Sequence, residues 1–197
     1  MTSPILPTLD EETLDMISKL TKLDQRKKIV VWGGGPGFIT SLARCALNSE
    51  IKVIPLNEKD AAAFNKDLSE FSDRISVLEP SSTANALPNS SIHLIIFSYL
   101  LYRHSNPLTI LNEVIRLLSA TGLLLIIDYR AIPLREYVGL IRKRLEGKFP
   151  DESIVNYATT NRYSTEDIGI LLDQKSFMIL KCISWRERQV LVVAQHW

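Results

Sequence analysis

Two features of the sequence predict an α/β fold with a doubly wound, mostly parallel sheet. Short runs rich in β-branched residues alternate with longer segments whose apolar residues recur every three or four positions, a pattern typical of strands and helices that take turns along a chain. The last two β-type runs are separated only by residues 186–188, so we expect them to pair as an antiparallel hairpin. Seven strands are expected, with one antiparallel strand at the edge of the sheet.

The expected elements follow in chain order. A first helix is expected over residues 10–23, within an N-terminal helical extension that covers residues 1–26. The β-branched runs predict strands at 28–32, 51–56, 75–78, 91–98, 122–128, 178–185 and 189–195. Helical spacing of apolar residues predicts helices between them at 37–47, 58–71, 107–118, 134–147 and 165–174. Ser164, followed three residues later by Asp167, predicts a capping box at the start of the last helix.

The composition is that of a single domain over residues 1–197. Hydrophobic residues make up 46% of the chain and charged residues 23%, which is enough apolar material for one substantial core. The formal net charge is only +1, and the lysines and arginines are spread along the whole chain. Because a protein that binds nucleic acid through its phosphates needs a basic stripe, nucleic acid is not expected as the main partner.

The cellular location is predicted from what the sequence lacks. Cys45 and Cys182 are the only cysteines, too few for a disulfide framework or a Cys-rich zinc site, which favours a reducing cytoplasm. The first residues contain no basic segment followed by an apolar core, and the longest apolar stretch, 93–102, is roughly half as long as a membrane span. We therefore expect a cytoplasmic protein without integral membrane association, and the sequence leaves a homo-oligomer open.

A glycine-rich loop, residues 33–37 (GGGPG), follows the first expected strand. In a doubly wound sheet this turn lies at the carboxyl end of the strand, where ligands bind, and glycine there accepts a positive φ and leaves the backbone bare. The spacing does not fit a dinucleotide fingerprint, because Phe38 or Thr40 stands where its last glycine belongs. No lysine follows the loop, which disfavours a P-loop and nucleoside triphosphates.

Residues 31–37 (VWGGGPG) resemble the first motif of the class I S-adenosylmethionine-dependent methyltransferases, which is an acidic residue, any residue and then G-x-G-x-G. The resemblance continues in order through Leu87-Pro88, Glu113, Arg116, Leu118, Gly122 and the segment 162–180. It covers residues 28–195. It implies a Rossmann-like fold, S-adenosylmethionine as cofactor and a small molecule as methyl acceptor.

The resemblance also implies a set of cofactor-binding residues. They lie in the glycine-rich loop, after the second strand, and before and at the end of the fourth strand: Gly33, Gly34, Gly35, Gly37, Asn57, Glu58, Thr83, Ala84 and Ser98. Four positions where the family carries acidic residues are occupied here by Val31, Asn57, Thr83 and His93. A hydrogen bond to a charged group contributes roughly 1.5–3 kcal/mol against about 1 kcal/mol for a neutral one, so we expect weaker binding of S-adenosylmethionine than is usual in the family.

Candidate substrate residues follow the fourth and fifth strands. Methyl transfer of this type depends mainly on aligning the acceptor with the sulfonium methyl group, so no catalytic residue is obligatory. His104 is the candidate general base, because the pKa of histidine lies near neutrality. The candidate substrate residues are Tyr99, Tyr102, Tyr129 and Arg162. The alternative is that Tyr99 and Tyr102 pack under the following helix while His104 lies in a solvated turn.

Residues 130–163 are a candidate substrate lid or insertion. The expected helix at 134–147 has apolar residues on one side and basic residues mostly on the other. Such a helix lies on a membrane, acts as a lid that admits an anionic substrate, or crosses over packed on the sheet. Residues 157–164 (YATTNRYS) are expected to form a polar and aromatic loop, which either shapes a substrate site or only connects elements.

Two functions from different classes remain. The first is an S-adenosylmethionine-dependent methyltransferase that transfers a methyl group to a small-molecule acceptor, mainly by proximity and orientation; the intact glycine-rich loop favours it. The alternative is a catalytically degenerate methyltransferase-fold protein that acts as a binding or scaffold module, which the four replaced acids favour. Methylation of protein or RNA is disfavoured by the near-neutral charge. With three histidines in the chain, no catalytic metal is expected.

Overall fold

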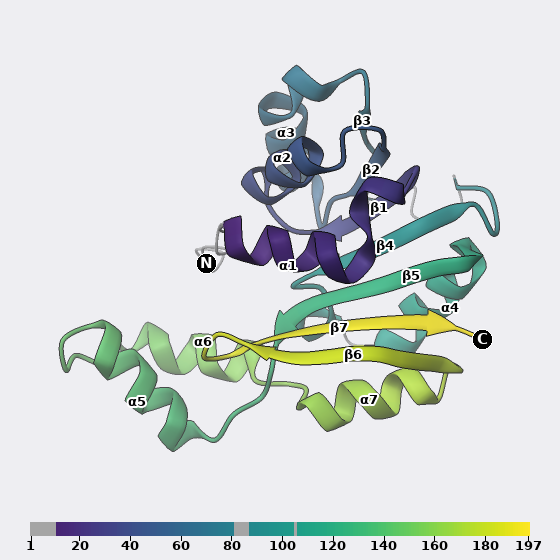
Figure 1. Cartoon of the computed structure of the whole chain (residues 1–197). Coiled ribbons are helices and arrows are strands. Elements are labelled where there is room, and N and C mark those ends of the chain that lie inside the picture. Colours follow the sequence, from purple (N-terminus) through teal and green to yellow (C-terminus); the bar gives the residue numbers. More distant parts are fainter. Residues whose placement is uncertain (1–10, 81–86, 105) are drawn as a thin grey trace.

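A seven-stranded sheet lies at the centre of the fold (Figure 1). The computed structural model describes residues 11–80, 87–104 and 106–197. Across these residues the strand order is β3-β2-β1-β4-β5-β7-β6. The strands are β1 (Lys28–Gly33), β2 (Glu50–Ile54), β3 (Ile75–Val77), β4 (Ile92–Ser98), β5 (Leu118–Tyr129), β6 (Phe177–Trp185) and β7 (Gln189–His196).

Most neighbouring strands run parallel. β1 pairs in parallel with β2 on one side and with β4 on the other, so Ile29 lies level with both Ile51 and Leu94. β2 with β3 and β4 with β5 are also parallel pairs. β7 runs antiparallel to both of its neighbours, β5 and β6. The predicted doubly wound sheet with a hairpin at its edge is confirmed, with β6 outermost and the reversed strand β7 one place inside it.

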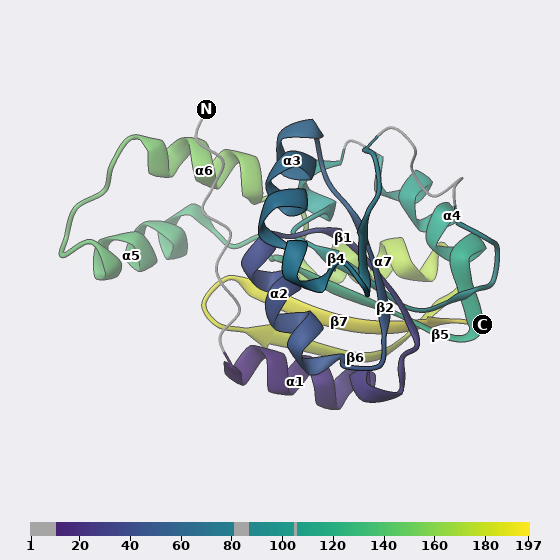
Figure 2. The same ribbon diagram turned by 90° about the horizontal axis from the view of Figure 1, so that it is seen from above.

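Helices cover both faces of the sheet (Figures 1 and 2). On one face lie α1 (Glu11–Thr21), α2 (Pro36–Cys45) and α3 (Glu58–Asp67), and on the other lie α4 (Pro107–Leu117) and α7 (Thr165–Asp173). Alternate residues of the buried strands serve the two cores, so Ile29 and Val31 face one core while Val30 and Trp32 face the other. Short 3-10 turns occur at η1 (Leu23–Gln25), η2 (Ser69–Phe71) and η4 (Leu101–Arg103).

Two further helices, α5 (Leu134–Arg144) and α6 (Glu152–Thr160), lie beyond the end of the sheet near the β6–β7 turn (Figure 1). The expectation of a loop over 157–164 is wrong for its first part, because α6 continues to Thr160. The buried residues of α6 are Ser153 and Thr160, whereas its apolar Ile154 and Val155 are exposed, so no buried apolar face marks the helix.

β5 begins earlier than its apolar run predicts. It starts at Leu118, directly after α4, and the β4–β5 register is irregular between Ile92 and Leu94. A Cβ at Gly122 would lie 2.9 Å from the carbonyl oxygens of both Ile92 and Ser119. The irregular pairing therefore brings two backbones so close that only glycine fits between them.

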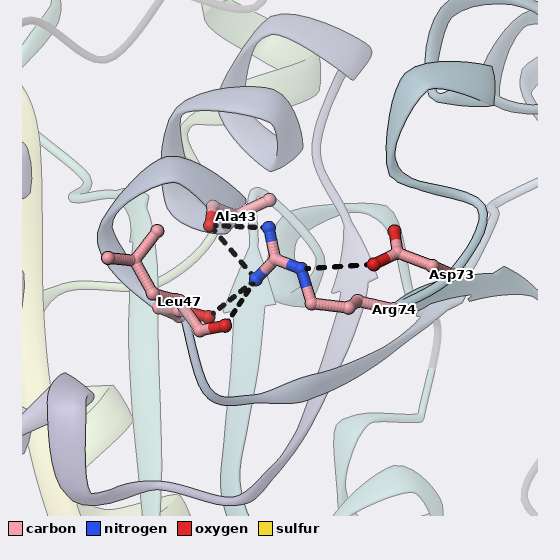
Figure 3. A network of polar contacts seen from close by, with 5 residues as sticks. Ala43, Leu47, Asp73 and Arg74 are labelled. Carbon is pink, nitrogen blue, oxygen red and sulfur yellow. Dashed lines mark hydrogen bonds and ion pairs between the residues drawn. The ribbon is translucent and has the colours of Figure 1, made fainter.

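The carboxyl end of α2 is held by Arg74, which comes just before β3 (Figure 3). Its Nη1 donates to the carbonyl oxygens of Ala46 and Leu47, both at 3.0 Å, and its Nη2 donates to that of Ala43 at 3.3 Å. Ala43 lies in the last turn of α2, Ala46 is its C-cap and Leu47 follows it. At this end a helix has no N–H partners left for its carbonyls and carries partial negative charge. One guanidinium thus fixes α2 to β3 and positions the helix that begins at the glycine-rich loop.

Candidate functional site

The glycine-rich loop begins between the ends of β1 and β4. The Gly34 N–H donates to the Ser98 carbonyl oxygen at 3.1 Å. Gly33 and Gly34 have φ angles of 85° and 81°. A Cβ at position 33 would lie 2.6 Å from the Ser98 carbonyl oxygen, and one at position 34 would lie 3.0 Å from Cδ1 of Phe38. The protein's own packing therefore requires glycine at both positions, whatever ligand it binds.

The other two glycines of the loop begin helix α2. Gly35 is its N-cap and Pro36 occupies the first turn, where the missing N–H of proline costs nothing. Gly37 also lies in the first turn and is exposed. Pro36 has no N–H and the Phe38 N–H already donates to the Gly35 carbonyl oxygen at 3.0 Å. The Gly37 amide and the partial positive charge of the helix dipole are therefore what this end of α2 offers a ligand carboxylate.

The residues implied for the adenosyl group differ in how free they are to contact a ligand. Asn57 is the N-cap of α3: its Oδ1 accepts from the Asp60 N–H at 3.0 Å, and its Nδ2 donates to the Asp60 carboxylate at 2.9 Å. Glu58, next in the chain, is exposed in the first turn of α3. Thr83 and Ala84 lie outside the described residues. Asn57 thus already has a structural role, and Glu58 is the exposed carboxylate beside it.

Two other positions where an acidic residue is replaced differ in their distance from the loop. Val31 lies in β1, two residues before Gly33, and is fully buried in the core. His93 lies near the start of β4, five residues before Ser98. At about 3.3 Å per residue, His93 lies roughly 16 Å from the end of the strand where the loop lies. Neither residue offers a charged group to a ligand at that edge.

Three tyrosines gather at the carboxyl ends of β4 and β5. The Tyr99 and Tyr129 rings lie 4.9 Å apart between centroids, and those of Tyr102 and Tyr129 lie 5.6 Å apart. Tyr99 has a φ of 55°, which is unusual for a residue with a side chain, and its buried hydroxyl has no hydrogen-bond partner among the described residues. Burial raises the pKa of Tyr99 and raises that of Tyr129 to about 12. The three tyrosines are thus brought together as one aromatic cluster, in which Tyr99 and Tyr102 are buried in the core and Tyr129 is partly exposed.

Asp128, which the sequence analysis did not single out, lies beneath this cluster. It is buried, and its carboxylate accepts from the Leu101 N–H and the Tyr129 N–H, both at 2.7 Å. Burial raises the pKa of Asp128 to about 7, although the backbone amides oppose the shift. The carboxylate ties turn η4 to the end of β5 and so positions Tyr102. An acid directly after the apolar run 123–127 was the available sequence signal.

His104 and Arg162 also come together. His104 caps η4, is half-buried, and accepts through its carbonyl oxygen from Nη1 of Arg162 at 3.5 Å. Burial lowers the pKa of His104, so the imidazole is neutral at pH 7. A neutral imidazole is a suitable proton acceptor.

Three of the residues that continue the family resemblance after the glycine-rich loop, Leu87, Glu113 and Arg116, contact one another. Arg116 donates from Nε to the Glu113 carboxylate at 3.0 Å and from Nη1 to the Leu87 carbonyl oxygen at 3.0 Å. These contacts fasten the chain before β4 to α4, so they stabilise the fold and touch no part of the glycine-rich loop.

Residues 130–163 are tied together by polar contacts near the β6–β7 turn. The Ile132 N–H donates to Oδ1 of Asn161 at 2.7 Å, and the Tyr157 hydroxyl donates to the Ile132 carbonyl oxygen at 3.0 Å. Among the apolar residues expected on one side of α5, Tyr137 is buried, whereas Leu134 and Leu145 are exposed. The helix lies beyond the sheet and not across its face (Figures 1 and 2).

Two findings concern the described ranges alone. No group of three or more His, Cys, Asp or Glu side chains lies close enough together there to hold a metal ion. No helix among those residues is both long enough and apolar enough to cross a bilayer.

Comparison with solved structures identifies the fold. A S-adenosylmethionine-dependent methyltransferase from Aquifex aeolicus matches with a TM-score of 0.68 and 16% identity, over 96% of this chain and 100% of the other. A putative type 11 methyltransferase from Sulfolobus solfataricus matches with a TM-score of 0.64 and 18% identity, over 96% and 94% of the two chains. An O-methyltransferase family protein from Burkholderia thailandensis matches with a TM-score of 0.70 and 14% identity, over 94% of this chain and 55% of its own.

Some of these matches are to longer proteins: this chain spans about half the length of the Burkholderia protein and of the pyocyanin biosynthetic protein PhzM. No protein-family model matches the sequence, and no curated protein matches it significantly. At such low identities the likeness concerns the fold. The chain has the fold of the S-adenosylmethionine-dependent methyltransferases.

Proposed function

We propose that this chain is an S-adenosylmethionine-dependent methyltransferase that acts on a small-molecule acceptor. The observation that carries the proposal is the position of the glycine-rich loop, at the carboxyl ends of β1 and β4. The strand order reverses between these two strands, and ligands of doubly wound sheets bind outside such a switch point. The solved methyltransferases with this fold support the choice of cofactor.

In the proposed site, Gly35 and Gly37 direct the amide end of α2 toward the methionyl carboxylate. Glu58 takes the place nearest the ribose, because Asn57 is engaged in capping α3. Bound S-adenosylmethionine supplies an electrophilic methyl group on its sulfonium. With Val31 buried and apolar, fewer charged contacts hold the cofactor, so its affinity is lower than is usual for such sites.

The acceptor is proposed to lie against Tyr129, the partly exposed ring of the aromatic cluster, with Arg162 beside it. Tyr99 and Tyr102, 2% and 3% exposed, support that ring from the core side. His104, neutral at pH 7, accepts the proton that the acceptor releases. Residues 130–163 form the outer wall of this site, and the whole chain acts as one domain in the cytoplasm. Most of the rate gain comes from alignment of the acceptor, so the tyrosines contribute by positioning.

The proposal is tested by titrating the purified protein with S-adenosylmethionine and with S-adenosylhomocysteine, using calorimetry and thermal unfolding. We expect saturable binding with a dissociation constant near the high end of the micromolar range and a matching rise in the unfolding midpoint. No heat and no shift at millimolar ligand would overturn the proposal.

A second candidate function is a binding or scaffold module that has lost the cofactor. It is favoured by the finding that Gly33 and Gly34 are required by contacts with β4 and that Asn57 caps α3, so these residues are explained without a cofactor. Mass spectrometry of the freshly purified protein separates the two. Co-purified adenosyl compounds support the methyltransferase, whereas their absence together with a failed titration supports the scaffold.

A further inference from the structure

A cavity of about 290 Å³ lies between α5, α6 and the β6–β7 turn. Its apolar lining comes from Tyr129, Tyr137, Leu140 and Ile141. Arg188, in the turn directly before β7, also lines the cavity. An apolar cavity of about 150 Å³ already accommodates benzene, so this one has room for a substituted aromatic ring.

Arg188 is held in place by aromatic rings. Its guanidinium carbon lies 4.7 Å from the centroid of the Tyr137 ring and 5.5 Å from that of Tyr129, and its Nη2 donates to Oδ1 of Asn161 at 3.4 Å. These contacts fix the side chain but leave its charge without a carboxylate among the described residues. The buried Nε of Arg188 also has no hydrogen-bond acceptor among the residues that the structure describes. An arginine that is oriented yet unpaired is a site for an anion.

The other charges around the cavity point the same way. Besides Arg188, the lining contains Arg144 and one acidic residue, Glu187. Glu187 pairs with Arg144 at 2.8 Å and so does not neutralise Arg188. The positive charge of Arg188 therefore stays unbalanced beside an apolar wall.

We propose that this cavity binds a small aromatic carboxylic acid, with the carboxylate paired to Arg188 and the ring against Tyr129, Leu140 and Ile141. Arginine presents two parallel N–H groups that match a carboxylate, and a singly charged anion matches one unpaired arginine. Aromatic and aliphatic side chains give the ring its contact area.

The position of Tyr129 connects the cavity to the rest of the site, since its ring also contacts Tyr99, the residue after Ser98. The aromatic acid is thus the proposed methyl acceptor, and only this role as acceptor rests on the proposed function. Binding of the acid itself is measured without any cofactor.

The test is calorimetric titration of the full chain with 2-naphthoate, its neutral methyl ester, decalin-2-carboxylate and inorganic phosphate. We expect 2-naphthoate to bind with a dissociation constant around the low millimolar range or below, as befits a ligand of this size. The ester, the saturated acid and phosphate should each bind at least tenfold more weakly. Equal binding of the ester, or no binding of 2-naphthoate at all, would overturn the proposal.

Variants locate the binding. Arg188→Gln should weaken the binding of 2-naphthoate at least tenfold. Arg188→Lys should bind it with an affinity between those of the unmodified chain and Arg188→Gln. Arg142→Gln is the matched control, because Arg142 is exposed on α5 and does not line the cavity. Should Arg188→Gln fail to fold by circular dichroism, the comparison of acid and ester on the unmodified chain still decides. Binding of 2-naphthoate without any binding of S-adenosylmethionine would refute the proposed function and retain this site.

Discussion

The Ser98 carbonyl oxygen lies 2.6 Å from the place where any residue other than glycine at position 33 would carry its Cβ. The end of β4 thus occupies the space beside β1 that the sequence motif alone would assign to a ligand. Gly33 and Gly34 shape the edge of the sheet, and Gly35 and Gly37 remain as the glycines whose position at the start of α2 concerns a ligand. Substitutions in the loop should therefore divide into two classes.

Gly33→Ala should destabilise the fold. Its φ of 85° costs roughly 1–2 kcal/mol for a residue with a side chain, and the contact with a backbone oxygen adds to this, so we expect a loss of roughly 2–4 kcal/mol in the free energy of unfolding. Urea denaturation measures it. Gly139→Ala is the control: nothing lies within 4 Å of its Cβ, and helix propensity predicts a gain of about 1 kcal/mol. Unchanged stability of Gly33→Ala would contradict the packing argument.

Gly37→Glu should abolish cofactor binding without harming the fold. An acidic residue in the first turn of a helix stabilises it by about 0.3–1 kcal/mol, but the new carboxylate takes the place proposed for the ligand carboxylate. We expect the unfolding midpoint to stay or rise while the shift caused by S-adenosylhomocysteine disappears. Gly139→Glu, an exposed change in α5, should keep that shift. A shift that persists in Gly37→Glu would remove α2 from the binding site.

Asp128 should make stability depend on pH. Unfolded aspartate loses its proton near pH 4, whereas Asp128 in the folded chain keeps its proton up to about pH 7. The folded state binds more protons between these values, so the free energy of unfolding should fall as pH rises from about 4 to about 7, by on the order of a few kcal/mol.

Asp128→Asn should remove this decline, and urea denaturation at several pH values in that window measures it. Asp167→Asn serves as the opposite control. Hydrogen bonds from Ser164 lower the pKa of Asp167, so the stability it contributes is lost as pH falls. A wild-type slope that Asp128→Asn leaves unchanged would assign the pH dependence to other groups.

Arg74→Met should release the carboxyl end of α2. The substitution keeps the apolar stem but leaves the carbonyls of Ala43, Ala46 and Leu47 without their donor, which should cost roughly 1–3 kcal/mol. Hydrogen exchange should then quicken in the last turn of α2. Arg44→Met, which removes an exposed contact at 3.6 Å to Glu70, should cost well under about 1 kcal/mol. An equal loss in the free energy of unfolding for the two variants would show that Arg74 does not cap α2.

Periodicity predicted the sheet and most helices because each carries an apolar face that must be buried. α6 buries Ser153 and Thr160 and leaves Ile154 and Val155 exposed, so it has no buried apolar face of this kind, and it was missed. The glycine spacing predicted bare backbone but not that Ser98 would fill the space beside it. Asp128 was missed for a similar reason: its partner, the Leu101 amide, lies 27 residues away in the chain, and only the fold brings the two together.

The place of β7 between β5 and β6 has a consequence during translation. β6 leaves the ribosome before β7, yet it is joined to the sheet through β7 alone in the observed strand order. Until β7 emerges, the edge of β5 that pairs with β7 stays unpaired, and β6 has no strand to pair with. Docking of β7 is therefore a late, non-local step, and a stalled chain that ends before residue 189 should attract chaperones.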